Sequence, residues 1–192
     1  ALLHKRPGGN STNLYFVGDS HAEFYSRSSP NDIALNKLNA HSIWLGPRTL
    51  TGIYFEGSSK IQIEKIIQYL HSTDQNTSNN KPSLCAISIG NIDIRCFFHQ
   101  ALALGLVKNE QKLLEVFVES AQNFFSQLAE AIQTQFPHMV FGIVEVLYCN
   151  ADDGYSGTDR KHIRQLLKEE GFPTLGSVEN RVRWTHQVNQ KL

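Results

Sequence analysis

Net charge, membrane-length apolar runs and nucleotide-binding motifs are all missing from this 192-residue sequence. Its 18 basic residues balance its 18 acidic ones, and no Lys/Arg stripe with interleaved aromatic residues occurs. We therefore expect neither nucleic acid nor an anionic membrane surface as a partner. No apolar stretch approaches the ~20 residues that span a membrane. Because Gly-x-Gly-x-x-Gly and P-loop patterns are both absent, we expect no nucleotide cofactor, and no other pattern indicates a cofactor.

Cysteine is scarce as well. Cys85, Cys96 and Cys149 are odd in number and show no metal-ligand spacing, so we predict no metal site. Cys85 and Cys149 lie in apolar runs typical of strands, which favours buried, reduced thiols and a reducing compartment such as the cytoplasm. Glycosylation sequons at Asn10 and Asn76 leave the compartment open.

What the sequence does contain is an alternation of predicted strands and helices. Near-continuous apolar runs predict buried strands at residues 14–17, 42–45, 84–89 and 139–147. Apolar periodicity and capping residues predict helices at residues 59–71, 110–135 (capped by Asn109), 159–170 and 178–192, and a short helix at 21–27.

This alternation predicts a three-layer α/β/α fold around a mainly parallel, flavodoxin-like sheet. The length suits one compact domain over residues 1–192. Within it, residues 1–12 are expected to be loosely held, and the polar stretches 72–81 and 152–157 are expected to be exposed loops.

The first predicted strand runs directly into Gly18-Asp19-Ser20-His21. Glycine lets the backbone turn sharply at the carboxyl edge of a parallel sheet, which is where open α/β folds bind their ligands. A serine at this position suits a nucleophile, because the N–H groups of a following helix would favour the negative charge of the product. The alternative is that Ser20 is an ordinary N-cap of that helix.

Two further loops follow predicted strands and should meet the first at the same edge. One carries Gly46 and the other carries Gly90-Asn91-Ile92-Asp93-Ile94-Arg95. The backbone N–H groups of Ser20 and Gly46 and the side-chain amide of Asn91 are of the right chemical type to hold an oxyanion. Asn91 and Asp93 could instead satisfy backbone groups of the turn. Arg95 could hold an anionic substrate group or pair with Asp93.

Together these blocks resemble the SGNH/GDSL hydrolase superfamily. The Gly-x-x-Asp block with Arg95 is similar to the Gly-Glu-Ile-Asp-Cys-Arg block of a bacterial branch, although the family's amide donor falls at Ile92 and Asn91 stands one place earlier. The resemblance implies a serine esterase with Ser20 as nucleophile and an oxyanion hole from Ser20, Gly46 and Asn91, acting on a small-molecule or carbohydrate ester. The residues that would support this site or its substrate are Asp19, His21, Gly90, Asp93 and Arg95.

The C-terminal part of the chain departs from the family pattern. The family's catalytic histidine lies in an Asp-x-x-His stretch after a last strand, whereas residues 179–189 resemble the segment upstream of that stretch. His186 falls in this segment and has no aspartate three residues before it. We therefore expect the final strand, the closing helix and the catalytic histidine beyond Leu192, so that residues 1–192 alone would be inactive or nearly so. The alternatives are a non-catalytic module that binds a glycan or an acylated ligand, and a flavodoxin-like regulatory domain.

Several other polar residues have ordinary structural interpretations. Because adjacent side chains diverge, His21 is expected to make a positional or substrate contact rather than to act as the general base. His99, His138 and His162 have no partners at metal-ligand spacing and are expected at the surface or in packing roles. Glu145 lies in an apolar run, where it must be paired or reach the edge of the sheet, and there it could line the pocket.

Overall fold

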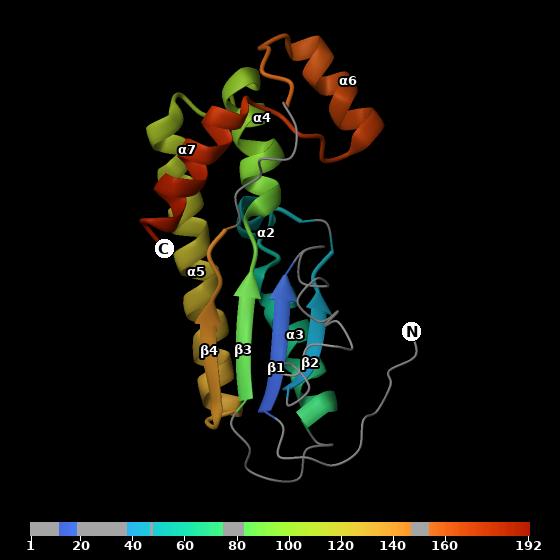
Figure 1. Cartoon of the computed structure of the whole chain (residues 1–192), viewed down its shortest axis with the longest axis vertical. Helices are drawn as coiled ribbons and strands as arrows, with labels where there is room; N and C mark the ends of the chain where they lie inside the picture. Colours follow the sequence, from blue (N-terminus) through green and yellow to red (C-terminus); the bar gives the residue numbers. More distant parts are fainter. Residues whose placement is uncertain (1–11, 19–37, 47, 75–82, 147–153) are drawn as a thin grey trace.

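The computed structural model describes residues 12–18, 38–46, 48–74, 83–146 and 154–192 of the chain. These residues form an α/β structure with one parallel sheet, helices packed on it and a further group of helices beyond one end of the strands (Figure 1). The predictions for residues 1–12, for a helix at 21–27 and for loops at 72–81 and 152–157 fall wholly or largely outside these ranges.

The sheet of the described residues has four strands: β1 (Thr12–Gly18), β2 (Leu38–Trp44), β3 (Ser83–Ser88) and β4 (Met139–Ile143). Their order across the sheet is β2-β1-β3-β4. All three pairings are parallel, which confirms the predicted α/β class and its parallel sheet. Parallel neighbours need long crossover connections, and in the described part of the chain helices supply them.

Two of the strands have bounds that differ from those expected. β2 begins four residues before residue 42, in a partly polar stretch that pairs with β1 at one edge of the described sheet. β4 ends at Ile143 instead of residue 147. Beyond β4, the N–H of Val146 donates to Oδ1 of Asn189 and the Val146 carbonyl accepts from Nδ2, both at 2.9 Å. The side-chain amide near the C-terminus therefore holds this segment outside the strand.

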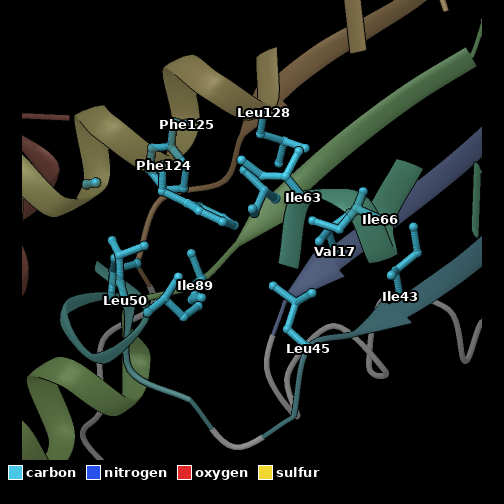
Figure 2. Packing of buried hydrophobic residues seen from close by; sticks show 14 of the residues in the cluster. Val17, Ile43, Leu45, Leu50, Ile63, Ile66, Ile89, Phe124, Phe125 and Leu128 are labelled. Atoms are coloured by element: carbon cyan, nitrogen blue, oxygen red, sulfur yellow. The ribbon is translucent and has the colours of Figure 1, made fainter. Parts of the chain in front are cut away.

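One face of the sheet is covered by two helices, α3 (Ser59–Asp74) and α5 (Glu110–Gln135), which lie behind the strands in Figure 1. Tyr15, Val17 and Ile87 point to this face and are completely buried. Figure 2 shows Val17 close to Ile63 and Ile66 of α3 and Leu128 of α5. The sheet and these two helices thus enclose the main hydrophobic core.

The long helix α5 contributes the aromatic part of this core. Phe117 and Phe124 are at most 1% exposed, and Phe125 is 5% exposed. These three aromatic side chains therefore belong to the main core. Asn109 caps the helix as predicted, because its Oδ1 accepts from the N–H of Lys112 at 2.9 Å.

The helices in the described ranges cover only that one face of the sheet. On the opposite face Leu14, Phe16 and Leu84 are partly exposed, and Val140 of β4 is 62% exposed. The predicted third layer therefore stays a prediction. None of the helices in the described ranges is both long enough and apolar enough to cross a membrane.

The remaining helices lie beyond the carboxyl ends of the strands. Two follow strands closely: α2 (Leu50–Phe55) comes after β2, and a π-helical turn, η2 (Asp93–Phe97), comes after β3 and continues into α4 (Phe98–Leu104). Neither α2 nor the η2–α4 segment was predicted. Each is short, and α2 contains Gly52, a residue that weakens helix formation.

Two C-terminal helices complete this end of the molecule, α6 (Arg160–Glu170) and α7 (Val178–Asn189). Both were predicted, and the N-cap residues Asp159 and Ser177 begin them. Ile163 of α6 packs with Cys96 and Leu175 in a small hydrophobic cluster separate from the main core. Both Cys96 and Cys85 are buried free thiols, as expected for Cys85, whereas Cys149 lies outside the described residues.

Candidate functional site

The carboxyl ends of β1, β2 and β3 lie side by side, as the sequence predicts. Gly18 is in register with Trp44 of β2 and with Ser88 of β3. The N–H of Leu45 also donates to the Gly18 carbonyl at 2.8 Å, which joins the first two strands at their ends. The three loops that follow therefore leave the sheet from adjacent positions, about 5 Å apart. Asp19, Ser20 and His21 lie outside the described residues.

Gly46, in the loop after β2, has φ = +85°, a conformation that disfavours residues with a Cβ. A Cβ at this position would meet no atom of the described residues within 4 Å. Glycine is thus required here by the backbone conformation and not by lack of space.

Gly90, in the loop after β3, is constrained in two ways. Its φ is +114°, and a Cβ would lie 2.9 Å from Cζ of Phe117 and 3.2 Å from Cγ2 of Val146. The backbone therefore turns directly against the core helix α5. This close approach sets where the residues after Gly90 begin their helical turn.

Asn91 follows at the start of that turn and is 8% exposed. Its side-chain amide makes no hydrogen bond with any residue in the described ranges. A buried amide normally finds partners within the protein. An oxyanion-binding role would use this amide as a donor.

Asp93 is completely buried and joins two of the loops. Its Oδ2 accepts from the N–H of Leu50 at 2.6 Å, and its Oδ1 accepts from the N–H and the hydroxyl of Thr51 at 3.1 and 2.5 Å. Asp93 therefore does satisfy backbone groups, as one alternative held. These groups belong to the first turn of α2, more than forty residues away, and the backbone N–H of Asp93 itself is a further donor.

Burial raises the pKa of Asp93 from 3.8 to about 6. The hydrogen bonds from Thr51 and Leu50 act in the opposite direction, because they favour the ionised carboxylate. Burial has the larger effect, since a carboxylate loses its hydration in a completely enclosed position.

The alternative in which Arg95 pairs with Asp93 is wrong. Its Nη2 donates to the carbonyl of Phe172 at 3.1 Å, and its own carbonyl accepts from the N–H of Leu175 at 2.7 Å. Residues two apart on a helical turn point in different directions, so Asp93 faces α2 while Arg95 faces the segment before α7. Arg95 thus holds the C-terminal segment, and its Nε is buried without a partner among the described residues.

The other polar residues singled out from the sequence lie elsewhere. Glu145 is exposed and follows the end of β4, so it is not held within a strand. His138, His162 and His186 are exposed, whereas His99 is buried with Nε2 2.9 Å from the Gly157 carbonyl oxygen. Among the residues that the structure describes, no three His, Cys, Asp or Glu side chains form a group that could hold a metal ion.

The sequence did not predict α2, nor the contact between its first turn and Asp93. Thr49 is its N-cap, and the Thr49 hydroxyl oxygen accepts from the N–H of Gly52 at 2.9 Å. A threonine before the apolar run that starts at Leu50 was a usable signal for a helix start. No signal in the sequence points to the contact between Thr51 and Asp93, because it depends on the tertiary fold.

No family model matches this chain, and no curated protein or solved structure matches it. The fold itself defines the class: an α/β protein whose described strands form one parallel sheet, with buried polar residues at the carboxyl edge.

Proposed function

We propose that this protein is a serine ester hydrolase of the SGNH/GDSL type. The observation that carries the proposal is the convergence of three glycine-bearing strand ends at one sheet edge, with Gly18 leading directly into Asp19 and Ser20. The strand order β2-β1-β3-β4 also corresponds to the first four strands of the flavodoxin-like order 2-1-3-4-5.

In this proposal the hydroxyl oxygen of Ser20 attacks the ester carbonyl carbon. The N–H groups of Ser20 and Gly46 and the amide of Asn91 donate to the oxyanion of the tetrahedral intermediate. A histidine accepts the Ser20 proton and delivers it to the leaving alcohol, and water then hydrolyses the acyl-enzyme by the same steps.

An exposed tryptophan supports a small-molecule or carbohydrate ester as substrate. Trp44 ends β2 in register with Gly18 and is 58% exposed. Indole rings are usually more buried than this, and their faces suit stacking on apolar groups. A sugar ring or an acyl chain of an ester held at Ser20 could therefore lie against Trp44.

The test is covalent labelling of the full-length protein with a fluorophosphonate reagent, followed by location of the modified residue by mass spectrometry. We expect labelling at Ser20 that is lost in Ser20→Ala. Ser126→Ala is the matched control, because Ser126 is exposed on α5 and should not affect labelling. Labelling that persists in Ser20→Ala would show that the nucleophile is assigned wrongly.

A further inference from the structure

The loop between β2 and α2 is held at both of its ends. At the first end, the N–H of Leu45 donates to the Gly18 carbonyl at 2.8 Å. At the second end, Leu50 and Thr51 donate three hydrogen bonds to the carboxylate of Asp93. Gly46 lies between these two anchors, so the direction of its peptide depends on both.

The second anchor accounts for the start of α2. The N–H groups of the first helical residues have no partners within a helix. Here the N–H groups of Leu50 and Thr51 donate to Asp93, and that of Gly52 donates to the Thr49 hydroxyl. Three N–H groups at the beginning of α2 are therefore satisfied from within the protein, two of them by Asp93 of η2.

Other contacts fix α2 on its remaining sides. Leu50 and Ile53 are buried in the main core, where Figure 2 shows Leu50 close to Ile89. The hydroxyl of Tyr54 donates to Glu119 of α5 at 2.8 Å. Burial and the hydrogen bond to α5 hold the helix against the core, whereas Asp93 accepts hydrogen bonds that join its first turn to the loop after β3.

We propose that Asp93 is a positioning residue: its buried carboxylate fixes the first turn of α2 and thereby orients the Gly46 N–H at the sheet edge. The inference rests on the proposed function, in which that N–H is an oxyanion donor. Asp93 would not touch the substrate. It would align the loop after β2 with Asn91, which stands two residues before it on the loop after β3.

A carboxylate suits this task better than an amide. Two oxygens accept all three hydrogen bonds from Leu50 and Thr51. An asparagine has one carbonyl oxygen and would turn its NH2 group toward one of these donors. Asp93→Asn keeps the size of the side chain but replaces one of the two accepting oxygens with a donor, so it is the variant that tests the proposal.

The experiment combines labelling kinetics with NMR of the full-length protein. In Asp93→Asn we expect the rate constant for fluorophosphonate labelling to fall about 10- to 100-fold, because a misplacement of about 1 Å can cost that much. The reagent's dissociation constant should change less than about twofold, since the interaction lost acts in the transition state. The amide resonances of Leu50, Thr51 and Gly46 should all shift.

Thr51 provides the graded controls. Thr51→Val removes one donor to Asp93 at constant size, so we expect a smaller loss of labelling rate, and Thr51→Ser should retain the normal rate. These variants also serve if Asp93→Asn does not fold. Asn109→Ala, at the start of α5, controls for a general loss of stability and should label normally.

Two results would overturn the inference: normal labelling rates in both Asp93→Asn and Thr51→Val, or an unchanged Gly46 resonance while those of Leu50 and Thr51 shift. The second would mean that Asp93 only caps α2. If the unmodified protein is not labelled, it is the esterase proposal that fails. The Gly46 resonance then decides by itself whether Asp93 positions this loop.

Discussion

The body of the sheet buries chiefly apolar side chains, whereas its carboxyl edge also buries a carboxylate. Between the sheet and helices α3 and α5, completely buried side chains such as Val17, Ile66 and Leu128 are apolar. At the carboxyl edge, Thr51 and Asp93 are just as buried, and both are polar. Burying an apolar side chain stabilises a protein by about 1.5–3 kcal/mol, whereas burying a carboxylate is costly unless it is hydrogen-bonded.

This difference indicates what each region does. Many apolar side chains of suitable volume can fill a core, so its contacts chiefly provide stability. The hydrogen bonds of Asp93 are directional and join two loops in one arrangement. The edge therefore gains a defined geometry at some cost in stability, which is the usual arrangement at a functional site.

The largest expected effect is a loss of stability when a large side chain of the hydrophobic core is removed. Phe117 is completely buried and its ring lies 5.5 Å from that of Phe98 in an edge-on contact. Phe117→Ala should lower the free energy of unfolding by about 4 kcal/mol, because it leaves a cavity in the core. Chemical denaturation measures this loss. Leu106→Ala is the control, since Leu106 is 61% exposed and its removal should change stability by less than about 0.5 kcal/mol.

The next effect is a change with pH in the free energy of unfolding, caused by the buried carboxyl group of Asp93. Because burial raises the pKa of Asp93 from 3.8 to about 6, the folded protein binds this proton more tightly than the unfolded chain. Its contribution to stability is full below pH 3.8 and is lost as the pH rises through 6. The total loss is about 3 kcal/mol.

Asp93→Asn does not titrate at this position, so it serves as the reference. The free energy of unfolding of the unmodified protein, minus that of Asp93→Asn, should fall by about 2.4 kcal/mol between pH 4 and pH 7. Denaturation at a series of pH values measures this difference. A difference that stays constant over the range would contradict a raised pKa for Asp93.

A smaller effect is the difference in stability between alanine substitutions at the two loop glycines, Gly46 and Gly90. Gly46→Ala meets no neighbour among the described residues, so the expected cost is that of its backbone conformation, about 1 kcal/mol. Gly90→Ala adds a contact at 2.9 Å with Phe117 and should lower stability by about 2 kcal/mol more. Thermal unfolding compares the two variants. Equal losses would show that Phe117 can move aside, and the edge would then be less rigidly joined to the core than the structure indicates.

The parts of the fold that could be predicted are those that local patterns determine. β1 and β3 are continuous apolar runs, and α5 is a long amphipathic helix with a capping asparagine, so their positions follow from the residues themselves. α2 was missed because six residues containing a glycine have little tendency to form a helix alone. Its first turn depends on Asp93, which is remote in the sequence.

At the candidate site the same distinction holds. The sequence alone determined that three glycine-bearing loops follow buried strands, because hydrophobic runs and glycine turns are local features. Only the tertiary structure decided that Asp93 binds Leu50 and Thr51 while Arg95 turns toward Phe172. Both side chains belong to one short turn, and their hydrogen-bond partners lie more than forty residues away in the sequence. The partners therefore depend on how distant segments of the chain pack together.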